Sequence, residues 1–108
     1  MLMPLPPQLS PEQRHAALQK AAAARRQRAE LKEKLKAGSV GLKEVLDLSE
    51  RDDVIGKLKT VTVLESLPGL GKVRARRTME ELDISENRRL RGLGAKQRES
   101  LLKRFDTR

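Results

Sequence analysis

Large apolar residues are unevenly distributed along this chain of 108 residues. Residues 11–37 contain only three of them, Leu18, Leu31 and Leu35, among alanines and basic side chains. Residues 39–108 contain 22 residues of the Val, Leu, Ile, Met and Phe types, which is enough for one small core. The pattern therefore predicts an extended proline-rich tail (1–9), a long basic alanine-rich helix (10–38) and a compact domain (39–108).

Helix-boundary signals stand at both ends of the alanine-rich segment. Ser10 suits an N-cap, Pro11 suits the first helical position and Gln13 completes a capping box. Gly38 predicts the end of the helix. Leucines one turn apart at the C-terminal end can anchor that half on a core, whereas alanine supplies helix propensity with little area to bury.

The remainder of the chain has the pattern of an all-α domain. Short helices are expected at 41–49, 52–58, 61–67, 72–83 and 95–105. In the fourth of these, Ala75, Met79 and Leu82 fall on one apolar stripe, while Val73 falls on the opposite side. The run Thr60-Val-Thr-Val is the only β-like stretch, and it fits equally well as the start of a helix after a threonine cap.

The distribution of charge indicates a polyanionic partner. The chain has 24 Lys and Arg against 15 Asp and Glu, a net charge of +9 and a pI of about 10.5. The two ends are basic, with eight basic and three acidic residues in 1–38 and twelve and six in 67–108, whereas 39–66 has four and six. Nucleic-acid-binding domains commonly have such clustered charge. Phe105 is the only aromatic residue, so platforms for stacking single-stranded bases are missing, and a duplex held by its phosphates is the better guess.

Several other classes of site have little support in the sequence. There is no cysteine, and His15 is the only histidine. Asp52 and Asp53 fit the first turn of a helix better than a metal site. No apolar run approaches the roughly 18 residues of a membrane span. The start lacks the basic n-region of a secretory signal, and either Met1 or Met3 could be the initiator. We therefore expect no enzyme activity, no metal, no cofactor and no membrane association.

The stretch Leu67-Pro-Gly-Leu-Gly-Lys-Val-Arg predicts a phosphate site. Gly69 and Gly71 accept positive φ at little cost, so they permit a tight reversal between helices with Leu70 turned inward. Backbone amides at the start of the following helix lack partners and carry the positive end of its dipole, where Lys72 and Arg74 add charge. An ordinary helical hairpin with solvated arginines is the alternative. The predicted binding segment comprises Pro68, Gly69, Leu70, Gly71, Lys72, Val73 and Arg74.

A second basic cluster contains Arg88, Arg89 and Arg91 beside Gly92 and Gly94. Glycine lets the backbone approach closely, and the weakly hydrated, planar guanidinium suits a narrow minor groove. We expect these arginines to cover a groove or to bind a second run of phosphates. The alternative is a surface loop that carries charge for solubility.

The basic residues of the long helix form a candidate second DNA surface. Lys20, Arg25, Arg26 and Arg28 could lie along a phosphate backbone, or the helix could be a solvated arm. Pro68 could insert between base pairs and kink the duplex, or it could simply stop a helix.

Base-specific recognition has little support in these clusters. Only Asn87, with Gln97 just beyond, offers a side-chain amide, and phosphate contacts carry no sequence information. We therefore expect low sequence specificity.

These segments together resemble the actinobacterial integration host factor family of nucleoid-associated proteins. The similar stretches are Glu12-Gln-Arg, Ala21-Ala-Ala-Ala-Arg-Arg-Gln-Arg-Ala-Glu-Leu-Lys, Asp53-Val-Ile-Gly-Lys, Leu64-Glu-Ser-Leu-Pro-Gly-Leu-Gly-Lys-Val-Arg-Ala and Arg88-Arg-Leu-Arg-Gly-Leu-Gly. The first residues and 39–52 depart from the family pattern. The resemblance implies a helix–two-turn–helix (H2TH) module, in which the two-turn segment binds phosphate and the arginine segment acts as a lid.

The resemblance also implies a function and a location. It implies a cytoplasmic protein on the nucleoid that binds, bends and compacts duplex DNA and assists phage integrases in site-specific recombination. No heptad seam is long enough for a coiled coil, so we expect a monomer. A ribosomal small-subunit protein uses the same module, so structural RNA binding remains the alternative. DNA repair glycosylases use it as well, but here Pro4 is followed by Leu5 rather than an acid, and zinc ligands are missing.

Overall fold

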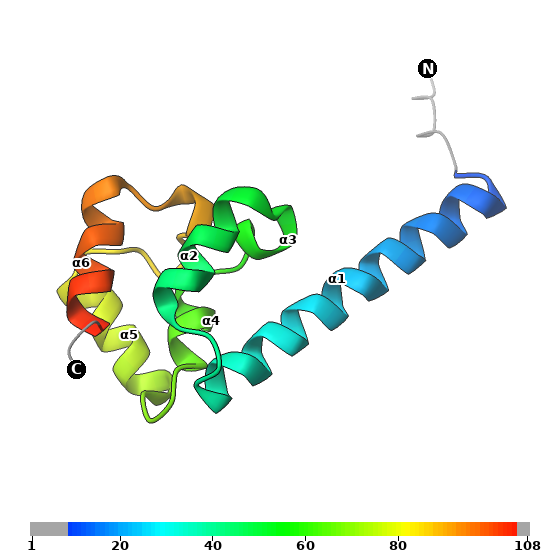
Figure 1. Ribbon diagram of the computed structural model, residues 1–108. Helices are drawn as coiled ribbons and strands as arrows, with labels where there is room; N and C mark the ends of the chain where they lie inside the picture. The colour runs from blue at the N-terminus through cyan, green and yellow to red at the C-terminus, as the bar shows by residue number, and fades with distance from the viewer. Residues whose placement is uncertain (1–8, 106–108) are drawn as a thin grey trace, which may run out of the picture.

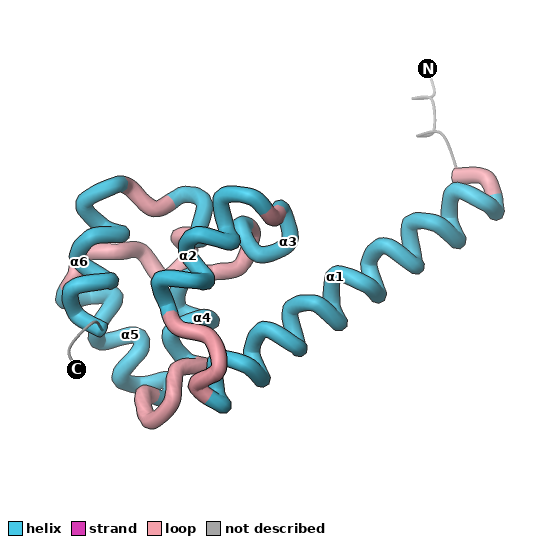
Figure 2. Tube along the Cα trace, in the orientation of Figure 1, coloured by secondary structure: helices cyan, strands magenta, loops and turns pink. Residues whose placement is uncertain are grey.

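The computed structural model describes residues 9–105, and within that range it is all-α, as expected (Figure 2). The elements are α1 (Pro11–Ala37), α2 (Leu42–Arg51), α3 (Asp53–Gly56), α4 (Thr60–Glu65), α5 (Gly71–Glu81), the 3₁₀ turn η1 (Leu90–Gly92) and α6 (Ala95–Phe105). The one β-type feature in this part of the chain is an isolated antiparallel bridge between Lys59 and Arg89. The predicted extended tail lies outside the described residues, apart from Leu9.

The first helix extends away from a compact group formed by the other elements (Figure 1). The Ser10 hydroxyl accepts a hydrogen bond from the Gln13 amide (3.1 Å), and the Ser10 amide donates to Gln13 Oε1 (2.9 Å). Gly38 ends the helix with a φ of 75°. The predicted capping box and glycine stop are therefore confirmed.

Only the C-terminal part of α1 is held by the core. Leu31 and Leu35 are buried, whereas Leu18 is 61% exposed. Between these positions, Gln27 Nε2 donates to Asp52 Oδ2 and so fastens α1 to the start of α3. Residues 11–30, which we call the arm, give the molecule its elongated shape of 59 × 34 × 25 Å.

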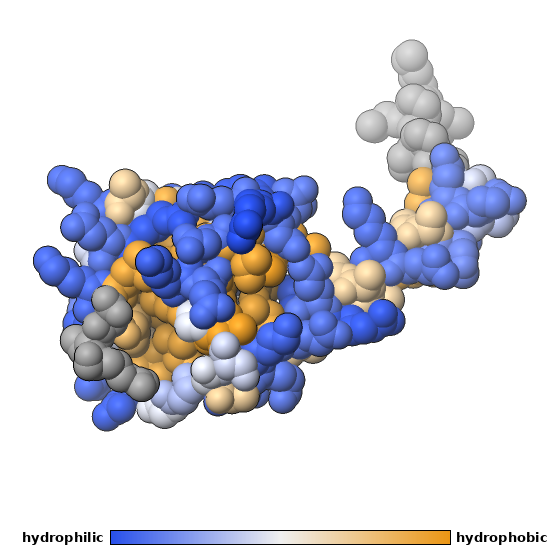
Figure 3. All heavy atoms as spheres, viewed as in Figure 1, coloured by the Kyte–Doolittle hydropathy of each residue, from blue (hydrophilic) through white to orange (hydrophobic). Residues whose placement is uncertain are grey.

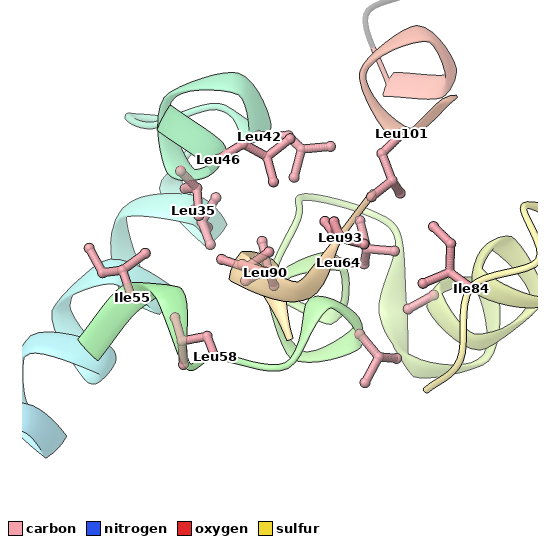
Figure 4. Close-up of a cluster of buried hydrophobic side chains, with 14 of the residues drawn as sticks. Leu35, Leu42, Leu46, Ile55, Leu58, Leu64, Ile84, Leu90, Leu93 and Leu101 are labelled. Atoms are coloured by element: carbon pink, nitrogen blue, oxygen red, sulfur yellow. The ribbon is translucent and has the colours of Figure 1, made fainter. Parts of the chain in front are cut away.

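The core lies among the compact elements and includes the segment between α5 and α6. Leu90 is completely buried and Leu93 nearly so, and both enter the same cluster as the leucines of α1, α2 and α6 (Figure 4). Ala75 and Met79 are fully buried, as the predicted stripe of α5 requires. Val73 is 73% exposed, which agrees with its place opposite that stripe.

The structure corrects the expected threonine cap. The segment is helical, but the N-cap of α4 is Lys59, and Thr60 is the first helical residue. The Thr60 hydroxyl is buried without a hydrogen-bond partner among the described residues. The start of α4 is instead held by a long-range backbone pairing. The Thr60 amide donates to the Arg88 carbonyl (2.9 Å), and the Leu90 amide donates to the Leu58 carbonyl (2.9 Å).

One face of the compact part is partly apolar. Figure 3 shows an apolar area between hydrophilic side chains, on the side where α2 and α6 lie. A hollow of about 390 Å³ there is lined by Gly41, Leu42, Lys43, Leu102 and Phe105. With Lys43 as its one basic lining residue, this hollow has little to attract a phosphate backbone.

Candidate nucleic-acid interface

The reversal between α4 and α5 depends on two left-handed glycines. Gly69 has a φ of 74° and Gly71 a φ of 75°. A Cβ at either position would meet nothing within 4 Å, so the requirement is backbone conformation and not space. Leu70, between them, is half-buried and packs against the core, and its amide donates to the Leu67 carbonyl (3.3 Å). The predicted tight reversal and inward leucine are confirmed.

The N-terminal end of α5 is open. Its N-cap, Leu70, makes no side-chain hydrogen bond, and no acidic residue stands in the first turn. Ser10 closes the start of α1 and Asp52 closes the start of α3, whereas α2 and α4, like α5, have no side-chain cap. The first-turn amides of α5 have no acceptor within the helix, and Gly71 and Lys72 are exposed. This end can therefore bind an anion.

Two contiguous depressions connect this helix end with the second basic cluster. Lys72 and Arg88 both line an open depression of about 830 Å³. Arg88 also lines a neighbouring depression of about 610 Å³, together with Lys57, Arg89 and Arg91. The structure thus brings the two-turn segment (68–74) and the lid segment (88–94) onto one surface.

Not every predicted residue of α5 lies on that surface. Arg74 lines a different hollow with Arg104 of α6, on another side of the helix. The first depression also has three acidic lining residues, Glu80, Asp83 and Glu86, and Arg76 Nε lies 3.7 Å from Glu86 Oε1. That ion pair is largely exposed and therefore weak. The lining of this depression is thus of mixed charge.

The three arginines of the lid segment have different environments. Arg88 Nη1 donates to the Gly92 carbonyl (3.2 Å), and Arg89 Nη1 donates to the Lys57 carbonyl. Each of these two guanidiniums thus uses one nitrogen, and its other donors have no acceptor within residues 9–105. Arg91 differs, because Nε and Nη2 both donate to the Ser49 carbonyl (3.3 and 3.2 Å) and Nη1 donates to Asp53 Oδ1 (2.8 Å).

The Asp53–Arg91 pair is intact at neutral pH. The hydrogen bond from Arg91, followed by its charge, lowers the pKa of Asp53 below the ordinary value of 3.8. A carboxyl whose pKa is lowered by folding stabilises the folded state above its unfolded pKa. That contribution is lost only as the pH falls through the lowered pKa.

Comparison with known proteins assigns the family. Residues 35–105 match the S13-like H2TH domain family. The chain is 59% identical over 100 residues to Integration host factor of Mycolicibacterium smegmatis, which covers 93% of this chain and 95% of the relative. It is 59% identical over 103 residues to Integration host factor of Streptomyces coelicolor, which covers 95% of each chain. The chain belongs to the actinobacterial integration host factor family.

A solved structure of the family shows the same fold with a nucleic acid. A structure of sIHF bound to an 8-bp palindromic DNA matches with a TM-score of 0.79 and 56% sequence identity, covering 81% of this chain and 98% of that chain. Both the two-turn segment and the lid segment fall inside the matched H2TH domain, whereas the arm lies before it.

The arm carries its basic residues around the whole helix. Lys20, Arg25 and Arg26 are exposed and Arg28 is half-buried. Successive residues turn by about 100°, so these four positions do not share one face. The structure therefore separates the four predicted residues around the arm.

The sequence interpretation missed several polar contacts of this family member. Gln97, considered above for base recognition, accepts from the Gly94 amide (3.0 Å) and donates to the Asp83 carbonyl (3.4 Å). Its amide is therefore used within the fold, whereas Asn87 is exposed. Gln27 lowers the pKa of Asp52 through its hydrogen bond, as do, to a smaller extent, the backbone amides that Asp52 caps. No local motif marks Gln27 or Gln97 for these roles.

Other classes of site find no support in the described part of the chain. Asp53 lies in the first turn of α3, as predicted, whereas Asp52 is the N-cap of that helix and not a first-turn acid. Asp52 Oδ1 accepts from the amides of Val54 (2.9 Å) and Ile55 (3.2 Å). Within residues 9–105 no cluster of His, Cys, Asp and Glu could hold a metal ion. No helix in the same range is long and apolar enough to cross a membrane.

Proposed function

We propose that this chain binds duplex DNA through backbone phosphates, with low sequence specificity. The observation that carries the proposal is the open N-terminal end of α5, which lies on one surface with Lys72 and the lid arginines. The DNA-bound state of sIHF, at 56% identity, supports the same partner here.

The two segments have complementary roles in this proposal. A phosphate oxygen accepts hydrogen bonds from the first-turn amides of α5, and Lys72 closes over it. Arg88 and Arg89, whose guanidiniums retain free donors, reach the groove or the opposite phosphates. Because phosphates are the same at every base pair, these contacts position the protein without recognising a sequence.

We also propose an architectural role on longer DNA. Pro68 is exposed beside the phosphate site and can act as an apolar wedge that bends the duplex. The arm offers a second basic surface for compaction. The name Integration host factor of the relatives supports a role in site-specific recombination, which we propose takes place beside a phage integrase. We further propose that the protein acts without enzyme activity, as a monomer on the cytoplasmic nucleoid.

The proposal is tested by the salt dependence of binding. Each neutralised phosphate lowers the log–log slope of affinity against salt by about 0.9, so five to nine contacts give a slope of roughly −4 to −8. Fluorescence anisotropy with duplexes of unrelated sequence should give similar slopes and affinities. A flat salt response contradicts phosphate binding.

The same assay distinguishes duplex DNA from RNA. The match to an S13-like domain makes structured RNA the competing partner. Structured RNA of equal length is added to the DNA-bound protein at fixed salt. Displacement of DNA by RNA at much lower concentration than by unlabelled duplex would assign the protein to RNA instead.

A further inference from the structure

Arg91 uses more of its hydrogen-bonding capacity within the protein than Arg88 or Arg89 does. All three of its guanidinium nitrogens donate within the protein, two to the Ser49 carbonyl and one to Asp53. Ser49 lies in the last turn of α2, where carbonyls lack helical partners, and Asp53 opens α3. One side chain of η1 therefore joins three elements.

The Arg91 guanidinium fits beside Gly56 only because glycine has no side chain. Gly56 is buried, and a Cβ there would lie 2.8 Å from Arg91 Nε and 2.7 Å from the Ser49 carbonyl oxygen. The φ of Gly56 is not in the left-handed region, so glycine is required there for space and not for conformation. The space for the guanidinium is thus bounded by the backbone of α2 and α3.

We propose that Arg91 is a positioning residue, which locks the lid segment to the α2–α3 junction so that Arg88 and Arg89 face the DNA. This inference rests on the proposed function and reassigns one of the predicted DNA contacts. The neighbouring Leu90 is buried in the core and its amide bonds to Leu58, so the lock and the core hold the same short turn. The backbone of Arg88 and Arg89, which precede Leu90, is thereby held in place, and the Arg88 carbonyl also accepts from the Thr60 amide.

Gly56→Ala tests this role without removing a charge. The added methyl meets both the Ser49 carbonyl oxygen and the Arg91 guanidinium, so the contact between these two groups is broken. Binding of a duplex therefore weakens, and the salt slope becomes shallower by up to about 2, the share of the two misdirected arginines. Gly41→Ala is the matched control, because a Cβ at Gly41 would meet nothing within 4 Å. If Gly56→Ala only lowered the stability of the fold, its salt slope, measured at a temperature where the variant remains folded, would equal that of the wild type.

A double-mutant cycle separates positioning from direct contact. If Arg91 acts through Arg88 and Arg89, then Gly56→Ala added to Arg88→Gln and Arg89→Gln weakens binding by less than about twofold more. If the losses multiply instead, Arg91 contributes independently of the two arginines and the inference is overturned.

A milder pair of variants covers the case in which Gly56→Ala does not fold. Asp53→Asn and Asp47→Asn raise the net charge equally, but only Asp53 pairs with Arg91. We expect Asp53→Asn to bind DNA about threefold more weakly than Asp47→Asn, the scale of an exposed ion pair. Equal binding by the two variants contradicts the lock.

Amide hydrogen exchange in the free protein tests the lock without DNA. The amides of Leu90 and Thr60, which bond across the lid, should exchange faster in Asp53→Asn than in Asp47→Asn. If the wild-type chain fails to bind duplex DNA, the proposed function fails, while this exchange result still decides whether Arg91 holds the lid. Unchanged exchange at both amides overturns the inference.

Discussion

At the scale of single residues, Gly71 is required for its backbone conformation. Its φ of 75° permits the reversal that starts α5, and an L-residue in that region costs about 1–2 kcal/mol. Nothing lies within 4 Å of its Cβ position, so space does not impose glycine there. The turn that exposes the first-turn amides of α5 therefore depends on the left-handed conformation of this residue.

Pro68 lies beside that turn, and its proposed role as a wedge makes a separable prediction. Pro68→Ala should reduce the bend of a duplex of about 30 bp while changing affinity by less than about threefold, because wedges act on base stacking and phosphates supply most of the affinity. Energy transfer between dyes at the two ends of the duplex measures the bend.

Pro11→Ala provides the control for this change, since Pro11 is also exposed but lies at the start of α1. The same bend in wild type and Pro68→Ala would leave Pro68 as a helix stop.

At the scale of elements, α1 has two parts with different energetics. Leu35 is 1% exposed within the core, whereas Leu18 is 61% exposed on the arm. The arm owes its helicity to alanine and to the Ser10 capping box, which are local and modest contributions. Tertiary packing therefore stabilises only the C-terminal part of the helix.

Two leucine-to-alanine changes on this one helix make the difference measurable. Leu35→Ala should lower the free energy of unfolding by about 2–5 kcal/mol, because it removes buried methyl groups and leaves a cavity. Leu18→Ala should change it by less than about 0.5 kcal/mol. Urea unfolding followed by circular dichroism compares them, and similar losses for both would mean that the arm packs on the domain in solution.

Elements whose ends depend on local chemistry could be predicted from the sequence. Ser10, Gln13 and Gly38 fix the ends of α1 within a few residues of themselves, and those ends agree with the structure. The start of α4 could not be predicted correctly, because the Thr60 amide is paired with Arg88, a partner 28 positions further along the chain.

The same distinction applies to the candidate interface. The turn at Gly69 and Gly71 depends on consecutive residues, so its left-handed conformation could be predicted from them. The contacts of Arg91 join it to Ser49, which lies 42 positions away, and those of Gln27 join it to Asp52 across 25 positions. Sequence spacing carries no information about such contacts until the fold is known, so all three lid arginines looked equivalent.

At the scale of the whole molecule, three of the six acidic residues of the middle segment (39–66) are used within the fold. Asp52 caps α3, Asp53 pairs with Arg91, and Glu50 Oε1 lies 3.0 Å from Arg98 Nη1. The net charge of +9 comes from the two basic ends, which contain the arm and the surface of the two-turn and lid segments (the H2TH surface). A long duplex could contact both.

The arm as a second DNA surface predicts an effect that depends on duplex length. From Arg28 to Pro11 the arm extends about 26 Å, the length of about eight base pairs, so a duplex that covers both the arm and the H2TH surface must be longer than that. The test variant has Arg25 and Arg26 changed to Glu. The control has Lys43 of α2 and Lys103 of α6, which are also exposed, changed to Glu, so both variants lose the same net charge. The two variants should bind an 8-bp duplex with similar affinity. On 30 bp the arm variant should bind at least about tenfold more weakly than the control, because two phosphate contacts become repulsions. Titrations with both duplexes measure these affinities. If the two variants lose equal affinity for the 30-bp duplex, the arm is a solvated helix that attracts DNA only through its net charge.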